Sequence, residues 1–245
     1  MGHKALVSLK SWSESDIGRK RANNEDYYFE DPHLGLFMVA DGMGGHRGGD
    51  QASKIAIEVA QKTYKTHIDN QVSPDLALKN SVIEAAKKVY QAGVLESSLR
   101  GMGTTLSALV IHGNQATIAH IGDTRIYCLR HDRLYQLTRD HSLVNDHVQA
   151  GLMTKEEARI SSFRHIITRA IGHDEEVQPD YFTVATERKD IFLLCTDGLN
   201  NMLVDNEIFE IIKNVTPKKA VKQLINEANK KGGDDNITVV LVESL

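Results

Sequence analysis

Four aspartates stand beside turn-forming residues at the predicted ends of strands. They are Asp41 before Gly42, Asp123 after Gly122, Asp197 before Gly198, and Asp235 before Asn236. Each one alone predicts no more than a turn, because Asp-Gly and similar pairs are common turn sequences. If the strands are neighbours, the carboxylates meet at one rim, where they would repel one another unless a cation lay between them. Carboxylate and carbonyl oxygens favour Mg²⁺ or Mn²⁺ over zinc, for which the chain has no cysteine spacing.

The stretch 41–46, with the sequence Asp-Gly-Met-Gly-Gly-His, follows directly on the apolar run 34–40. An acid at the end of a buried strand, followed by glycines that let bare backbone approach a ligand, indicates a site for a cation and an oxyanion. A nucleotide-binding loop is the alternative, because glycine-rich backbones also bind phosphates. The stretch gives neither Gly-x-x-x-x-Gly-Lys-Ser/Thr nor Gly-x-Gly-x-x-Gly before a helix, so we favour the metal site.

The chain around these residues alternates between clusters of strands and pairs of helices. Strands are predicted at 5–12, 27–29, 34–40, 104–111, 115–121, 125–130, 134–137, 181–185, 191–195 and 237–242, and helices at 50–67, 76–99, 207–213 and 218–230. The short breaks at 112–114, 122–124 and 131–133 predict hairpins, and therefore an antiparallel sheet. This pattern predicts an α+β fold with antiparallel sheets packed together and covered by helices. The polar segment at about 142–165, broken at Gly151, is expected to form a flap.

Composition excludes several classes of protein. The 245 residues carry 29 basic against 33 acidic side chains, net −4, which gives no basic excess for binding nucleic acid. No apolar run approaches the roughly 18 residues of a membrane span, so we expect no membrane insertion. Cys128 and Cys195 lie in apolar strand-like runs and are predicted to be buried thiols, which fits a cytoplasmic location. Without repeats or a linker, residues 1–245 are expected to form a single domain.

A second polar cluster, Asp16-x-Gly18-x-x-Arg21-x-x-Asn24-Glu25-Asp26, precedes the predicted strand at Tyr27. An arginine near a metal centre can bind two phosphate oxygens with its planar fork. With this cluster and the stretch 41–46, the chain closely resembles the metal-dependent serine/threonine protein phosphatases of type 2C in their bacterial form. The other motifs, in order over nearly the whole chain, are Gly101-x-Gly103-Thr104-Thr105, Gly122-Asp123-Thr124-Arg125, Leu137-Thr138-x-Asp140-His141-Ser142, Ile167-Thr168-Arg169-Ala170-Ile171-Gly172, Thr196-Asp197-Gly198-Leu199 and Gly232-Gly233-x-Asp235-Asn236-Ile237-Thr238.

The resemblance implies a fold and an activity. The fold is a central β-sandwich of two antiparallel sheets flanked on both sides by helix pairs, a four-layer αββα arrangement. The activity is metal-dependent hydrolysis of phosphoserine and phosphothreonine in proteins, opposing a serine/threonine protein kinase. Phosphorylated proteins and a cognate kinase are the implied partners, and we expect a monomer.

The resemblance also assigns metal ligands. Two Mn²⁺ or Mg²⁺ ions would share Asp41, the second would bind the carbonyl of Gly42, and the first would bind Asp197 and Asp235. A hydroxide bridging two metals would attack phosphorus in line, which is plausible because metal binding can lower the pKa of water from 15.7 to about 7.

The same resemblance assigns roles to three further residues. Asp26 would act on the second cation through water, and Arg21 would bind the phosphate. Asp123 would help to bind a third metal, and the alternative is a turn acid that caps a hairpin at Thr124.

His46 is the candidate general acid for the leaving alkoxide. Animal relatives carry histidine at the position of Met43, whereas bacterial members carry methionine there and histidine at the position of His46. A loop histidine with a structural hydrogen bond is the alternative. His120, inside an apolar strand run, is predicted to be a satisfied sheet histidine. His141 is predicted to be structural, because an adjacent Asp-His-Ser run is no evidence of a catalytic triad.

The flap departs from the bacterial pattern. Ser161, Ser162 and His165 stand where many relatives carry His-Pro and an asparagine, so substrate specificity does not carry over. Two other functions stay open: a catalytically weak phosphoprotein-binding scaffold, and a two-metal phosphomonoesterase for small molecules. The retained arginine and aspartates favour an active enzyme over a scaffold.

Overall fold

The structure, a computed structural model, describes residues 8–44 and 48–245, whose strands form two antiparallel sheets. The first sheet has the order β1 (Leu9–Asp16), β11 (Ile237–Ser244), β10 (Ile191–Cys195), β7 (Arg125–Arg130), β8 (Arg133–Gln136). The second has the order β2 (Asp26–Asp31), β3 (Leu36–Met43), β5 (Leu106–His112), β6 (Gln115–Ile121), β9 (Asp180–Ala185), and β4 (Gly103–Thr104) pairs with the end of β3. The predicted fold class is confirmed.

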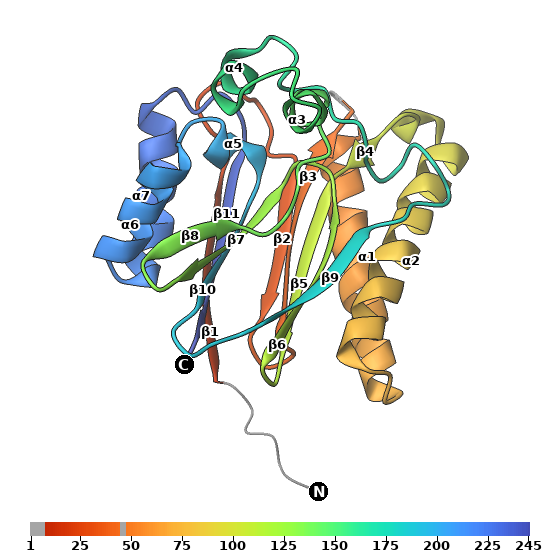
Figure 1. Ribbon diagram of the computed structural model, residues 1–245. Coiled ribbons are helices and arrows are strands. Elements are labelled where there is room, and N and C mark those ends of the chain that lie inside the picture. The colour runs from red at the N-terminus through yellow and green to blue at the C-terminus, as the bar shows by residue number, and fades with distance from the viewer. Residues whose placement is uncertain (1–7, 45–47) are drawn as a thin grey trace, which may run out of the picture.

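Two pairs of helices cover the sandwich on opposite sides (Figure 1). The long helices α1 (Gly49–Asp69) and α2 (Pro74–Leu95) pack on the second sheet, and a short 3-10 helix, η1 (Ser97–Leu99), follows α2. The helices α6 (Asp205–Asn214) and α7 (Pro217–Lys230) pack on the first sheet. No helix in the described ranges is long and apolar enough to cross a membrane.

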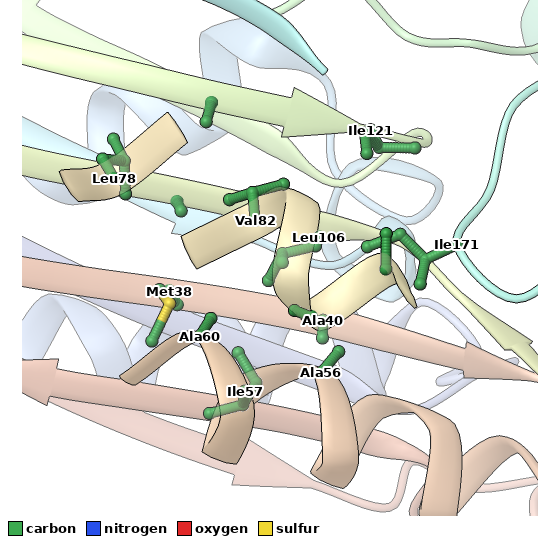
Figure 2. Close-up of a cluster of buried hydrophobic side chains, with 14 of the residues drawn as sticks. Met38, Ala40, Ala56, Ile57, Ala60, Leu78, Val82, Leu106, Ile121 and Ile171 are labelled. Carbon is green, nitrogen blue, oxygen red and sulfur yellow. The ribbon is translucent and has the colours of Figure 1, made fainter. Parts of the chain in front are cut away.

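Three apolar clusters hold these layers together, and strand periodicity explains them. In β3, Met38 packs against α1 and α2, whereas its neighbour Phe37 faces the other sheet. Figure 2 shows the helix-facing cluster, with Met38 close to Ile57 and Ala60 of α1. The inter-sheet cluster joins Phe37 to side chains such as Phe192 and Val240 of the first sheet. A third cluster lies under α6 and α7, so we infer the order helix pair, sheet, sheet, helix pair.

One predicted hairpin is wrong. The breaks at 112–114 and 131–133 are hairpins, but 122–124 carries the chain from β6 of the second sheet to β7 of the first. A short break limits how far apart two strands lie, but it does not decide whether they pair, and β6 pairs with β9 instead. The alternative reading of Asp123 as the cap of a hairpin at Thr124 therefore fails.

Other differences concern the ends of elements. The strand β3 continues through Met43, so Asp41 and Gly42 lie within its paired C-terminal end rather than after the strand. The one-turn helix α5 (Asp197–Asn200), which the sequence analysis missed, begins at Asp197. The strand β1 extends to Asp16, beyond the predicted end at Trp12, and residues 5–7 of the predicted strand lie outside the described residues.

The segment between β8 and β9 carries two short helices, α3 (Leu143–Gln149) and α4 (Lys155–Ile160), separated by Gly151 in the left-handed region at φ +71°. Figure 1 shows both helices above the end of the sheets where β3 terminates. The two ends of this segment are tied together, because Ser142 forms a β-bridge with Ile167 and the Leu143 amide donates to the Ile166 carbonyl at 2.9 Å.

Candidate metal centre

A cavity of about 490 Å³ opens at the rim where the two sheets meet. Its lining includes most of the predicted site, namely Arg21, Asp41, Gly42, Asp123, Asp197 and Asp235. The predicted convergence of the aspartates at one rim is therefore what the structure shows. His46 lies outside the described residues.

Strand pairing explains how acids far apart in sequence come together. Asp26 lies directly opposite Asp41 in the pairing of β2 with β3. Asp197 follows β10, and Asp235 precedes β11, which is the antiparallel neighbour of β10. Antiparallel neighbours place the end of one strand beside the start of the next, so these two acids reach the same edge.

The backbone at Asp41 and Gly42 is fixed on several sides. The Asp41 amide donates to Thr105 Oγ1 at 2.9 Å, and its carbonyl accepts from Thr104 Oγ1 at 2.9 Å. A Cβ at Gly42 would collide with the carbonyl oxygens of Gly49 and Glu25, so only glycine fits there. The sequence predicted Thr104 and Thr105 only as part of the strand 104–111. The Gly-Thr-Thr motif at 103–105 was the signal for their hydrogen bonds to the Asp41 backbone.

A buried histidine holds the crossing that carries Asp123. Gly122, at φ +110°, donates its amide to His141 Nδ1 at 3.0 Å, and the His141 amide donates to the Gly122 carbonyl at 2.8 Å. His141 Nε2 lies 3.1 Å from Asp180 Oδ2, and burial lowers the pKa of this imidazole. A neutral ring that accepts at Nδ1 and donates at Nε2 satisfies the contacts with Gly122 and Asp180. Arg169 Nη1 lies 2.7 Å from the same Nε2 and donates to Asp180 Oδ1 at 2.6 Å, so the buried ring belongs to a network of structural contacts, as predicted.

His120 is also a satisfied sheet histidine. Its Nδ1 lies 2.8 Å from Ser107 Oγ and its Nε2 lies 3.0 Å from the Arg139 carbonyl. Burial lowers the pKa of this imidazole to about 4.

The carboxylates of the cavity are destabilised by their surroundings. Burial, together with neighbouring acids, raises the pKa of Asp41 and that of Asp123 well above the ordinary value of 3.8. The same causes raise the pKa of Asp26 to about 7, although hydrogen bonds from Thr238 and Thr196 oppose the shift. For Asp197, burial and then the charge of Asp235 raise the pKa to about 6. These groups favour a proton or another positive charge.

Among the predicted site residues that the structure describes, three buried carboxylate oxygens have no hydrogen-bond partner: Asp26 Oδ1, Asp123 Oδ1 and Asp197 Oδ1. A buried acceptor without a partner is costly, and a bound cation removes that cost. The donor set consists of hard oxygens, which suits a divalent ion such as Mg²⁺ or Mn²⁺. Cys128 and Cys195 are free, buried thiols in β7 and β10, as predicted, and take no part.

The protein ligands are not sufficient by themselves. Within residues 8–44 and 48–245, no group of three His, Cys, Asp or Glu side chains is gathered closely enough to hold an ion alone. The carboxylate of Asp235 is bound to Arg21 instead, with 2.6 Å between Nη2 and Oδ2. Few protein ligands for each ion still fit Mg²⁺, which keeps several waters in its coordination shell.

The cavity also has lining residues that the sequence analysis did not assign. Asn201 lies one turn along from Asp197, which starts α5. Its Nδ2 donates to Asp197 Oδ2 at 2.9 Å and so holds that carboxylate in place. Lys20 pairs with Asp234 at 2.6 Å on the rim, and Arg164 and His165 line the cavity from the segment after α4. The spacing of four between Asp197 and Asn201 was the only signal available, and it required the helix to be recognised.

We expect Asp197→Asn to stabilise the chelator-treated protein at high pH. The folded state raises the pKa of Asp197 above 3.8, so it binds more protons than the unfolded state, and stability is lost as the pH rises through about 6. The variant escapes this loss, so its melting temperature should exceed that of the wild type by about 2 °C or more at pH 7.5. The difference should shrink as the pH falls below about 6 and vanish below the ordinary value of 3.8.

Thermal unfolding in chelator and in Mn²⁺ measures both effects. With Mn²⁺ the order should reverse, because the wild type alone keeps the full charge at this ligand and gains stability from binding. A variant that is no more stable than the wild type at pH 7.5 in chelator would contradict the account of the buried charge.

Comparisons with known proteins agree with this geometry. Residues 18–241 match the family model described as protein phosphatase 2C. The chain is 43% identical over 235 residues to the protein phosphatase PhpP of Streptococcus pneumoniae, covering 93% of this chain and 94% of that protein.

Solved structures give the same answer. The Mycobacterium tuberculosis serine/threonine phosphatase PstP/Ppp matches with a TM-score of 0.88 and 35% identity, covering 96% of this chain and 98% of that chain. The catalytic domain of the serine/threonine protein phosphatase PstP in complex with two manganese ions matches with a TM-score of 0.86 and 34% identity, covering 98% of this chain and 100% of that chain. The chain described here belongs to the protein phosphatase 2C family.

Proposed function

We propose that this protein is a metal-dependent phosphatase that hydrolyses phosphoserine and phosphothreonine in other proteins. The observation that carries the proposal is the cavity at the sheet rim, where buried carboxylates with unpartnered oxygens lie beside Arg21. Relatives that are a protein phosphatase and a serine/threonine phosphatase support the same activity. A binding scaffold would have no chemical need for this set of buried acids.

The residues that would hold two divalent cations are those assigned by the family resemblance. Asp41 would bind both ions, Asp197 and Asp235 would bind the first, and the Gly42 carbonyl would bind the second, with Asp26 acting through water. Such ions supply an activated water and stabilise charge on the phosphoryl oxygens. The structure of a relative with two manganese ions supports two ions per site, and we propose Mn²⁺ or Mg²⁺ as their identity.

Arg21 would orient the phosphate. Its side chain is half exposed at the cavity mouth, and its Nη2 lies 2.6 Å from Asp235 Oδ2. The planar guanidinium carries further donors that would bind two phosphate oxygens. Lys20 and Arg164 on the rim add positive charge near an anionic substrate.

We propose His46 as the general acid that protonates the leaving serine or threonine oxygen. The support is its place in the sequence, because His46 comes two residues after Gly44, and residues 41–44 line the cavity. Loss of this proton donor should flatten the alkaline side of the rate profile and lower kcat by roughly 100-fold. A pH–rate profile of His46→Ala that matches the wild type would leave only the structural alternative.

Asp123 is proposed to help bind a third cation. Its buried Oδ1 has no partner, and its carboxyl lies near that of Asp197. We expect Asp123→Ala to lower kcat on a phosphothreonine peptide by about tenfold or more. Calorimetry should still find two Mn²⁺ bound.

The matched control for this variant is Asp132→Ala, because the Asp132 side chain is 75% exposed and pairs only with Lys213 at 3.3 Å. Turnover by Asp123→Ala at the rate of this control would rule out a role in the reaction.

The decisive experiment measures phosphate release from a phosphothreonine peptide. We expect release with Mn²⁺, none with chelator, and a loss of at least about 100-fold in kcat/KM for Asp41→Asn, which removes the charge shared by both ions. Hydrolysis of a small aryl phosphate without hydrolysis of the peptide would favour the small-molecule phosphomonoesterase. Metal-dependent peptide binding without release would favour the scaffold.

The remaining proposals concern the setting of the enzyme. We propose that residues 1–245 act as a single catalytic domain, with the segment at about 142–165 as a flap over the cavity. We also propose that the protein is a cytoplasmic monomer that opposes a serine/threonine protein kinase. Two free, buried cysteines support a reducing compartment.

A further inference from the structure

The carboxylate of Asp26 is bound by hydroxyl groups from the opposite sheet. Thr196 Oγ1 and Thr238 Oγ1 each lie 2.7 Å from Asp26 Oδ2. Asp26 belongs to β2 of the second sheet, whereas Thr238 lies on β11 and Thr196 directly follows β10 of the first. Both threonines have no exposed surface. These contacts form a buried polar joint between the sheets at the cavity.

The direction of each hydrogen bond in this joint can be assigned for an ionised Asp26. The Thr238 amide donates to Thr196 Oγ1 at 2.9 Å, so the Thr196 hydroxyl is free to donate to the carboxylate. Thr238 also donates its hydroxyl to the carboxylate, so the Ser15 hydroxyl, 2.8 Å away, must donate to Thr238 Oγ1. Asn24 Nδ2 donates to Ser15 Oγ at 2.8 Å, and the Asp26 amide donates to Asn24 Oδ1 at 3.1 Å. The ring of contacts therefore closes on Asp26.

The two hydroxyls that donate to Asp26, those of Thr196 and Thr238, both reach Oδ2 and leave Oδ1 buried without a partner. The carboxylate can neither rotate nor exchange its two oxygens without breaking two short hydrogen bonds. Thr196 is also the neighbour of Asp197, and Thr238 lies three residues after Asp235. The joint thus sets the position of the acids of the first sheet relative to those of the second.

We propose that Thr196 and Thr238, supported by Ser15 and Asn24, are positioning residues for the second divalent cation. They hold Asp26 with Oδ1 directed to the ion's water shell, and they fix the position of one sheet relative to the other at the site. None of the four touches the ion. This inference rests on the proposed function, because it concerns an ion of the same centre.

A purely structural role is distinguishable because the fold contains a comparable threonine pair elsewhere. Thr117 Oγ1 lies 3.1 Å from Thr183 Oγ1 between β6 and β9, and neither residue lines the cavity. Thr117 is 5% exposed, so Thr117→Val removes a buried hydroxyl contact without reaching the metal centre. It is the matched control for Thr238→Val.

The test is calorimetric titration of the chelator-stripped full chain with Mn²⁺, with no substrate present. We expect Thr238→Val to weaken the weaker of the two Mn²⁺ sites by about 10- to 100-fold, the range for partners that orient a metal ligand. Thr238→Ser keeps the hydroxyl and should restore the affinity to within about threefold of the wild type, while Thr117→Val should bind as the wild type does.

Three results would overturn the proposal: wild-type affinity in Thr238→Val, equal weakening in Thr238→Val and Thr238→Ser, or equal weakening in Thr117→Val. If Thr238→Val does not fold, Ser15→Ala decides, because it removes one donor behind Thr238 and leaves both contacts to Asp26. We expect about tenfold weaker Mn²⁺ binding in that variant, and unchanged binding would overturn the proposal. Failure of the wild type itself to bind Mn²⁺ would contradict the proposed function rather than this inference alone.

Discussion

The carboxylates of Asp26, Asp41, Asp123 and Asp197 lie close to one another, the first and third buried and the other two partly buried, and their repulsion opposes folding until a positive charge joins them. Each of these groups has its pKa raised chiefly by burial, with neighbouring acids adding to the shift. A protein can retain such a cluster only if other interactions over-determine the surrounding structure. The centre is therefore a place where stability is given up for the ability to bind cations.

Apolar packing on both faces of both sheets supplies the opposing free energy. The strands β3 and β10 are almost entirely buried, because each has an apolar cluster on either side. At the rim, where apolar contacts end, short hydrogen bonds take over: Thr104 and Thr105 hold the backbone of Asp41 from one side. The rigid sandwich and these polar contacts together keep like charges in place against their repulsion.

Much of this arrangement could be predicted from the sequence. The runs of β then α, with short breaks, predicted the fold class, and the acids next to Gly or Asn at strand ends are the four aspartates Asp41, Asp123, Asp197 and Asp235 that line the cavity. The break at 122–124 was misread because apolar alternation says which faces are buried but not which strands pair. The contacts of Thr196 and Thr238 with Asp26 could not be predicted, since they join residues 170 and 212 positions apart in the chain and depend on how the two sheets pack at their rim.

The tied ends of the segment between Ser142 and Ile167 have a consequence for divergence among related enzymes. Because the β-bridge and the bond from Leu143 to Ile166 close this segment at its base, changes within it need not displace the strands that carry the acids. The entropy of closing such a loop grows only slowly with its length, so insertions and replacements there are cheap. Substitutions and insertions can therefore reshape the face beside the cavity, where Arg164 and His165 lie, while the strands that carry the acids keep their positions.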